Sequence, residues 1–163
     1  MHINSMIDCI DSQILSILQI NARTSNAEIA RQVEMAPSAV LERIRKLEER
    51  GIIRGYTTNL NPEFLGFGLL AYVFVRSEGG VWQGEFAEVL SAIPEVQEVH
   101  HIAGEDCFLV KVRVADAASL GALLRERFGS LPSVRSTRTT IVLNTVKETT
   151  ALAIGQESKG RGT

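Results

Sequence analysis

Cysteine is scarce in this sequence: Cys9 and Cys107 are the only two in 163 residues, and they show no CxxC or Cys/His spacing. This usage excludes a disulfide framework and gives no reason to expect a metal site. Long apolar runs are also missing, since stretches such as residues 69–75 fall far short of the roughly 20 residues of a membrane-spanning helix. Asp8 and Asp11 interrupt the apolar residues near the N-terminus, so we expect no secretion signal. We therefore expect a cytoplasmic protein with no membrane partner.

Positive charge is in short supply as well, because 17 Lys and Arg residues face 19 Asp and Glu, giving a net charge of −2. A strongly basic nucleic-acid binder is thereby excluded, and any DNA-binding surface must be local. The basic residues that are present gather in residues 43–54. With 45% hydrophobic and 22% charged residues, the chain has the balance of a folded globular protein.

The first half of the chain has the apolar periodicity of three short helices. The first is predicted over residues 7–21, and Thr24 or Ser25 caps a second over residues 26–33. Pro37 suits the first turn of a third helix that runs to Arg50 and ends at Gly51. The alternating residues after Gly51 predict an extended wing. Residues 1–60 are thus predicted to form a winged helix-turn-helix DNA-binding domain.

The second half changes to the period of two that is typical of strands. Strand patterns cover residues 69–76, 96–102, 108–114 and 134–146, and helical patterns cover residues 82–93 and 116–128. We expect the strand over residues 108–114 to have one face in water. The order is that of a ferredoxin-like βαββαβ domain, so the fold class is α+β. We place a linker or hinge at residues 61–67, this domain at 68–150 and a flexible tail at 151–163.

The outer face of the third predicted helix is the candidate DNA interface. At about 100° per residue, Val40, Ile44 and Leu47 face the core. Small polar and basic residues lie outside, where the second helix of a helix-turn-helix meets base edges and phosphates in the major groove. The candidate DNA-binding residues are Ser38, Ala39, Glu42, Arg43, Arg45, Lys46 and, in the wing, Arg54. An ordinary solvated helix face is the alternative interpretation.

Glu42 lies in the middle of this face and would repel phosphate. It can accept a hydrogen bond from cytosine or pair with Arg45 or Lys46 along the helix, and we favour the pairing. With so few net positive charges, a monomer would bind DNA weakly. We therefore expect a symmetric dimer, which an uncovered face of the ferredoxin-like sheet could form.

The turn between the second and third predicted strands is a candidate small-molecule site. Gly104 permits a sharp turn with exposed amides, and Glu105 and Asp106 add two carboxylates. Amides for a carboxylate and carboxylates for an amine would together suit an amino acid. From these residues alone, a plain polar hairpin turn is the better-supported alternative.

No residue set points to catalysis or to a cofactor. His100 and His101 are adjacent on a strand, so their side chains point to opposite faces and cannot chelate one metal ion. Cys107 lacks an arrangement of bases that would activate it. We therefore predict no catalytic residues, no cofactor and no metal.

Matches to one family recur in order along the chain. In the first half they are Ile7-Asp8, Asp11, Ile14-Leu15, Asn21-Ala22-Arg23, Glu28-Ile29-Ala30, Val40, Arg43, Leu47-Glu48, Gly51-Ile52-Ile53 and Gly55-Tyr56. In the second half they are Asn61-Pro62, Leu65-Gly66, Gly104, Lys111 to Val114 and Thr137-Arg138-Thr139. Over about residues 6–150 the chain resembles the leucine-responsive regulatory protein/AsnC (feast/famine) family of prokaryotic transcription regulators.

This resemblance implies a regulator that binds double-stranded DNA and dimerises through its sheet, with dimers assembling into octamers. It also implies an amino acid effector bound between dimers near the glycine turn. The implied effector residues are Gly104, Glu105, Asp106, Cys107, Thr137 and Thr139. Two departures stand out: many members have Ser where this chain has Ala36, and many have an aromatic residue followed by Asp where it has Asp106 and Cys107.

Two other functions are compatible with parts of the pattern. One is a small-molecule sensor or interaction module whose helical half does not bind DNA. The other is an enzyme on the ferredoxin-like domain, such as an acylphosphatase-like hydrolase. Its phosphate-binding loop would be residues 77–81, and this loop is acidic, which argues against the enzyme.

Overall fold

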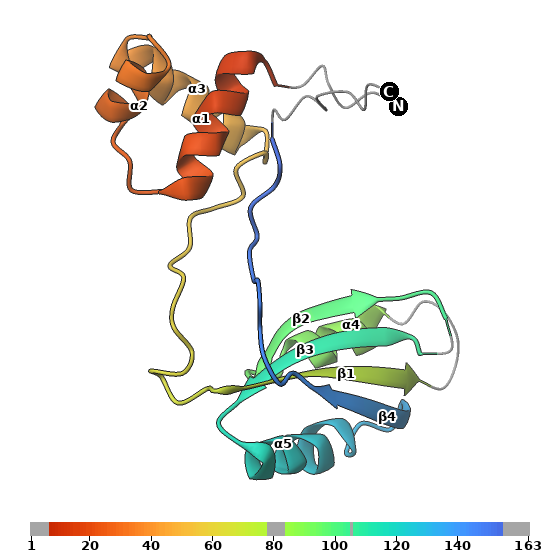
Figure 1. The fold of residues 1–163 in the computed structure, drawn as a ribbon. Helices are drawn as coiled ribbons and strands as arrows, with labels where there is room; N and C mark the ends of the chain where they lie inside the picture. Colours follow the sequence, from red (N-terminus) through yellow and green to blue (C-terminus); the bar gives the residue numbers. More distant parts are fainter. Residues whose placement is uncertain (1–6, 78–83, 105, 155–163) are drawn as a thin grey trace, which may run out of the picture. The chain divides into compact units, whose positions relative to one another are not determined.

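The computed structural model describes residues 7–77, 84–104 and 106–154 (Figure 1). The chain divides into two compact units. One consists of Met1–Thr58 together with Glu148–Thr163, and the other of Asn59–Lys147. None of the helices in the described ranges has the length and apolar character that crossing a bilayer requires.

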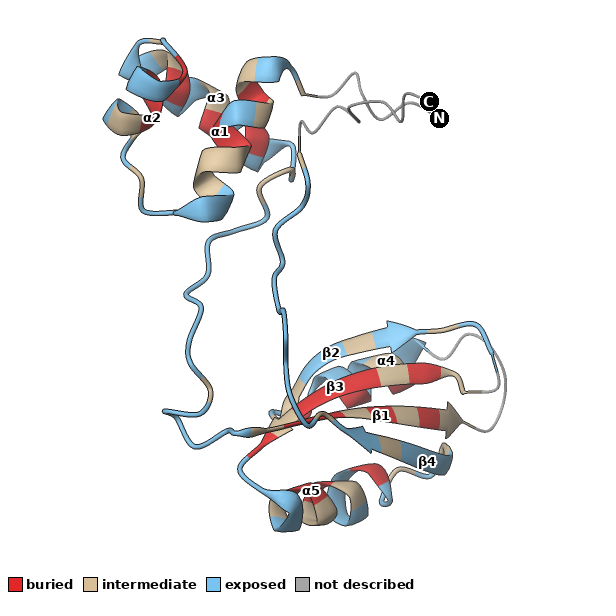
Figure 2. Cartoon of the chain, in the orientation of Figure 1, coloured by how far each residue is buried: buried red, intermediate tan, exposed pale blue. Residues whose placement is uncertain are grey.

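The first unit contains the three predicted helices: α1 (Cys9–Ile20), α2 (Asn26–Gln32) and α3 (Pro37–Glu49). Asp8 caps α1 through a hydrogen bond from the Asp11 amide, and Ser25 caps α2 through one from the Glu28 amide. The buried residues Ile14, Ile29, Ala30, Val33, Val40 and Ile44 join the three helices in one core (Figure 2). Glu34, in the turn between α2 and α3, has a φ of 54°. The sequence does not predict this positive φ, because the residue is neither glycine nor asparagine.

The segment after α3 that we predicted to be an extended wing forms no strand. Between α3 and the next strand, residues 51–68 contain no strand. Gly51 has a φ of 68°, as its predicted role requires, and the amides of Ile52 and Ile53 both donate to the carbonyl of Leu47. Ile53 packs against the helical core, whereas residues 54–60 are exposed. An extended segment becomes part of a sheet only where a second strand pairs with its backbone groups, and this unit supplies none in its described residues.

The second unit has the predicted ferredoxin-like order. Its elements are β1 (Leu69–Ser77), α4 (Gly84–Ser91), β2 (Val96–His101), β3 (Phe108–Val114), α5 (Ala117–Leu123), the π-helical turn η2 (Leu124–Phe128) and β4 (Val134–Ile141). The strands pair antiparallel in the order β2-β3-β1-β4. Of the helix predicted over residues 82–93, the structure describes Gly84–Ser91 as α4. Trp82 and most of the 77–81 loop lie outside the described residues.

One face of this sheet is covered by α4, α5 and η2. Phe86 and Leu90 of α4 and Phe128 of η2 pack on Val73 and Val110 of the two central strands, within a single buried cluster (Figure 2). Strand alternation places a second set of residues on the opposite face: Leu70, Tyr72, Phe74, Leu109 and Lys111. We call this second set the open sheet face.

The open sheet face is more buried at β3 than predicted. Lys111, which we expected to face water, is buried, and its Nζ donates to Glu98 Oε1 at 3.1 Å. Its register partners are Tyr72 on β1 and Glu98 on β2, so β3 has a neighbouring strand on each side. Period-two alternation identifies which face a residue occupies, but not how far neighbouring side chains cover that face.

The chain returns to the first unit after β4. The Leu152 amide donates to Gln19 Oε1 at 2.6 Å, and Gln19 Nε2 donates to the Leu152 carbonyl at 3.0 Å. Residues 151–154, which we expected to belong to a flexible tail, therefore lie against the end of α1, because one glutamine amide satisfies both backbone groups of an extended residue. Residues 155–163 lie outside the described residues.

Candidate DNA interface and effector site

The outer face of α3 has the layout that the helical projection predicted. Val40, Ile44 and Leu47 are buried, which fixes the inner side of the helix. The opposite side carries exposed Ser38, Glu42, Arg45 and Lys46, with Ala39 half-buried beside them. We call these five residues the α3 outer face. Small residues at the start of the helix leave room for close approach, and the cations Arg45 and Lys46 follow about two turns later.

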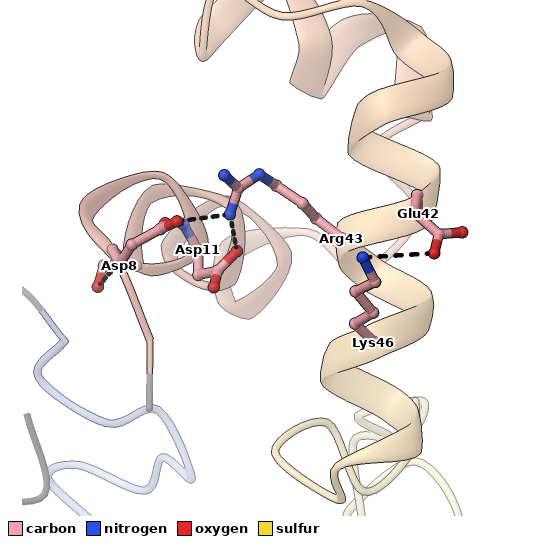
Figure 3. A network of polar contacts seen from close by, with 6 residues as sticks. Asp8, Asp11, Glu42, Arg43 and Lys46 are labelled. Atoms are coloured by element: carbon pink, nitrogen blue, oxygen red, sulfur yellow. Dashed lines mark hydrogen bonds and ion pairs between the residues drawn. The ribbon is translucent and has the colours of Figure 1, made fainter. Parts of the chain in front are cut away.

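Glu42 pairs along the helix, as predicted. Its carboxylate lies 3.6 Å from both Arg45 Nε and Lys46 Nζ, and Arg45 Nε is also 3.4 Å from Glu49 Oε1 (Figure 3 shows the Lys46 contact). Exposed pairs at i,i+3 and i,i+4 are worth only about 0.3–0.5 kcal/mol each. The two cations can therefore leave these carboxylates for a phosphate at small free-energy cost.

Arg43 does not lie with the α3 outer face, contrary to our prediction. Its Nη1 is 2.7 Å from Asp8 Oδ2 and 2.7 Å from Asp11 Oδ1, both on the N-terminal turn of α1. Figure 3 shows Arg43 extending to the two aspartates of α1, while Lys46 reaches toward Glu42. A single-helix projection could not detect this contact, because the two aspartates belong to a different helix.

Arg54 follows α3 in the exposed segment that we had predicted to be a wing. Two residues later, the Tyr56 hydroxyl donates to Glu48 Oε1 at 2.9 Å. Desolvation by neighbouring groups, together with the Glu48 carboxylate, raises the pKa of Tyr56 to about 12, although its side chain is half exposed. The phenol therefore stays protonated and keeps the start of this segment beside the end of α3.

Helix α3 has no side-chain hydrogen bond at its N-cap. Ala36 has the extended dihedrals of an N-cap, φ −72° and ψ 142°, but no side-chain acceptor, and Pro37 follows it. The amides of Ala39 and Val40 both turn to the Ala36 carbonyl. Alanine in place of the serine that many relatives have at this position thus leaves the N-terminal end of α3 without a side-chain hydrogen bond.

The glycine turn carries an ion pair that sequence reasoning missed. Gly104 has a φ of 140°, a conformation that essentially only glycine adopts. Asp106 Oδ2 accepts a hydrogen bond from Arg138 Nη2 at 2.8 Å, and the Arg138 guanidinium carbon lies 3.9 Å from the centre of the Phe74 ring. Arg138 is the middle residue of the Thr-Arg-Thr triplet, and strand alternation could have separated it from its two neighbours. Glu105 lies outside the described residues.

Cys107 is fixed in the same turn by its backbone. Its amide donates to the Val75 carbonyl at 2.9 Å, and its carbonyl accepts from the Ile102 amide at 3.0 Å. Hydrogen bonds from the Ser77 backbone and hydroxyl lower the pKa of the Cys107 thiol. Cys107 therefore lies beside Ser77 at the end of β1 and also packs against the helix-covered core.

Thr137 and Thr139 lie on the other side of β4 from Arg138. The register pairs them with Val75 and Val73, whose side chains belong to the helix-covered core. The structure thus brings Asp106 together with Arg138, and it does not bring the two threonines to that ion pair. Their predicted contact with an effector stays a prediction.

The two adjacent histidines have different surroundings, as strand alternation requires. His100 Nε2 is 3.0 Å from Glu98 Oε2, whereas the His101 ring lies 5.3 Å from that of Phe108. Within the described part of the chain, no three His, Cys, Asp or Glu side chains gather as a metal ion would require.

Comparison with known proteins identifies both halves of the chain. A family model of the AsnC-type helix-turn-helix domain matches residues 7–48, and one of the Lrp/AsnC ligand binding domain matches residues 70–152. The chain belongs to the Lrp/AsnC family. The family assignment also makes it a DNA-binding transcription regulator with a separate ligand-binding domain.

Relatives of this Lrp/AsnC protein match it over nearly its whole length. The leucine-responsive regulatory protein of Haemophilus influenzae is 40% identical over 154 residues, covering 93% of this chain and 92% of the relative. That of Escherichia coli K12 is 38% identical over 151 residues, covering 91% and 92%.

Solved structures agree with this Lrp/AsnC fold. A transcriptional regulator from Neisseria meningitidis in complex with L-methionine has a TM-score of 0.84 at 31% identity, covering 90% of this chain and 96% of that one. A feast or famine regulatory protein from Mycobacterium tuberculosis complexed with L-methionine has a TM-score of 0.80 at 35% identity, covering 86% and 95%.

Proposed function

We propose that this Lrp/AsnC regulator reads DNA with the α3 outer face. Ser38 and Ala39 lie at the N-terminal end of the helix, where base edges are contacted, and Arg45, Lys46 and Arg54 supply cations for phosphates. The observation that carries the proposal is the contrast between the two sides of α3. The inner side packs into the core through buried side chains, whereas Arg45 and Lys46 on the outer side are held only by weak exposed ion pairs.

Each subunit offers few phosphate contacts, because Glu42 and Glu49 offset part of the positive charge on α3. Binding must therefore be multiplied by assembly. We propose a two-fold dimer through the open sheet face, where Tyr72 and Phe74 are only half-buried.

Apolar side chains beside the sheet support assembly beyond a monomer. Phe64 precedes β1, and Leu143 and Val146 follow β4, and all three are almost fully exposed. Large exposed apolar patches are typical of surfaces that a second molecule covers. We propose that these three residues are buried when chains pair and when dimers assemble into the octamer that the family resemblance implies.

The glycine turn is the proposed effector site. Gly104, Asp106 and Arg138 place a backbone turn and charges of both signs at one end of the sheet, which suits the carboxylate and ammonium groups of an amino acid. Glu105, Cys107, Thr137 and Thr139 remain proposed contacts. Two structural relatives contain L-methionine, so methionine is the first effector to test.

The effector acts by favouring one assembly over another. It can shift the equilibrium only by the difference between its affinities for the two assemblies. A change of assembly alters the spacing of the helix-turn-helix units along DNA, and hence the affinity for a given set of half-sites.

Selection of bound fragments from a random DNA pool, with and without each amino acid, tests this function. We expect enrichment of sites with two-fold symmetry and a change in DNA affinity and sedimentation with at least one amino acid. If DNA is enriched but no amino acid alters the enrichment, the proposed effector site is contradicted and the proposed DNA binding is not. If no DNA is enriched but an amino acid still changes sedimentation, the chain is a small-molecule sensor without DNA binding.

A further inference from the structure

Arg43 joins α3 to α1 through one guanidinium nitrogen. Nη1 lies 2.7 Å from a carboxylate oxygen of Asp8, the residue that caps α1, and 2.7 Å from one of Asp11 in its first turn (Figure 3). The two carboxylates belong to the N-cap of α1 and to a residue of its first turn, three positions apart. Arg43 therefore fixes a point on α3 against the N-terminal turn of α1.

The Asp11 part of this contact is partly shielded from water, unlike the ion pairs on the α3 outer face. The side chains of Arg43 and Asp11 are 29% and 11% exposed, whereas that of Asp8 is 51% exposed and those of Arg45 and Lys46 are each 63% exposed. Charge-assisted hydrogen bonds in such surroundings are stronger and more directional than exposed ion pairs. In agreement, the hydrogen bond from the Asp11 amide and the Arg43 guanidinium lower the pKa of Asp8, and both aspartates raise the pKa of Arg43.

The buried residues Val40, Ile44 and Leu47 determine which side of α3 faces the core. Apolar contact is non-directional, so these residues do not by themselves set the exact rotation of the helix within that orientation. The helix also begins without a side-chain cap at Ala36. A directional contact at Arg43, near the middle of α3, therefore constrains the rotation of the helix about its axis.

We propose that Arg43 is a positioning residue for DNA recognition, held by Asp8 and Asp11 so that α3 presents Ser38, Ala39 and Lys46 to the groove. It acts through α1 and not by touching DNA. The inference rests on the proposed DNA binding and concerns how the binding surface is oriented.

Whether DNA affinity rises or falls when Asp8 is replaced separates this proposal from a purely electrostatic effect of the charge. Asp8→Asn keeps an Oδ1 that can cap α1, because Asn is as good an N-cap as Asp, but it replaces the oxygen that binds Arg43. Removing a negative charge beside DNA should by itself strengthen binding. The proposal predicts the opposite, a loss of about three- to tenfold, which is the effect of one charge-assisted contact.

Glu34→Gln is the matched control. Glu34 is an exposed carboxylate in the same unit, with no ion pair among the described residues, and the change removes one negative charge without touching Arg43. Affinity is measured by fluorescence anisotropy on a duplex recovered from the random pool, at several KCl concentrations. Far-UV circular dichroism and a thermal melt establish that each variant is folded.

Arg43→Met gives a second readout through the salt dependence. A lost phosphate contact lowers the slope of log K against log salt by about 0.9, whereas a lost positioning contact leaves the slope unchanged. We expect weaker binding with an unchanged slope, and a double variant with Asp8→Asn that is no weaker than Arg43→Met alone. Lys46→Gln, by contrast, should reduce the slope.

The proposal is overturned if Asp8→Asn binds as tightly as Glu34→Gln or more tightly, or if Arg43→Met reduces the slope by about one. Should Arg43→Met fail to fold, Asp8→Asn still decides the question. Failure of the proposed function is distinct from these outcomes, because the unaltered protein would then bind no duplex at any salt concentration.

Discussion

Replacing Ala36 with serine should stabilise the recognition helix. Ala36 already has φ −72° and ψ 142°, close to the φ −70° and ψ 152° of Ser25, which caps α2. The Ser25 hydroxyl accepts a hydrogen bond from the amide three residues later at 3.2 Å. A serine at position 36 offers a hydroxyl acceptor to the Ala39 amide, which now donates to the Ala36 carbonyl at 3.0 Å.

The magnitude follows from the value of an N-cap. Serine in place of alanine at this position is worth about 1 kcal/mol, so Ala36→Ser should raise the free energy of unfolding of the first unit by that amount. In a domain of this size, about 1 kcal/mol corresponds to roughly 4–8 °C in melting temperature. Ser25→Ala is the reciprocal change and should lower the stability by about the same amount.

Amide hydrogen exchange of α3 is the appropriate assay, because the single tryptophan, Trp82, belongs to the other unit and would not report on the helix. We expect slower exchange in Ala36→Ser and faster exchange of α2 in Ser25→Ala. If Ser25→Ala destabilises as expected but Ala36→Ser leaves α3 unchanged or less protected, the argument from matching dihedrals is refuted.

Three further perturbations test other parts of the structure. Phe128→Ala should destabilise the second unit by about 3–5 kcal/mol in urea unfolding, because Phe128 is fully buried in its core. Gln19→Ala should speed exchange of the Leu152 amide while leaving the β3 amides unchanged, since the Leu152 amide donates its hydrogen bond to Gln19 Oε1. Because its folded-state pKa is lowered, Asp8 stabilises the fold above about pH 4, its ordinary value, and this stabilisation disappears as the pH falls through the folded-state pKa. The stability difference between the unaltered protein and Asp8→Asn should therefore be constant at neutral pH and vanish in acid, and a difference that persists there would contradict it.

Features that depend on neighbouring residues in the chain could be predicted from the sequence. The helices and strands follow from apolar periodicity, and their ends from local signals such as Ser25, Pro37 and Asp116, each found at the start of its helix. Both domain types could be recognised on this basis. The outer face of α3 followed in the same way from its helical period.

The contacts that sequence reasoning missed join residues far apart in the chain. Arg43 and Asp8 are 35 positions apart, Arg138 and Asp106 are 32 apart, and Gln19 and Leu152 are 133 apart. A helical projection places Arg43 beside the DNA-facing residues because it contains no information about a second helix. Long side chains such as arginine reach several possible partners, and only the packing of the elements decides among them.

Site-specific cross-linking tests most directly whether the α3 outer face meets DNA. A photoreactive phenylalanine derivative is placed at Ser38 on α3 and, as a control, at Gln13, an exposed residue of α1. With a selected duplex, we predict cross-links from position 38 within both half-sites and none from position 13. Equal cross-linking from the two positions, or cross-linking from position 13 alone, would show that another surface binds the DNA.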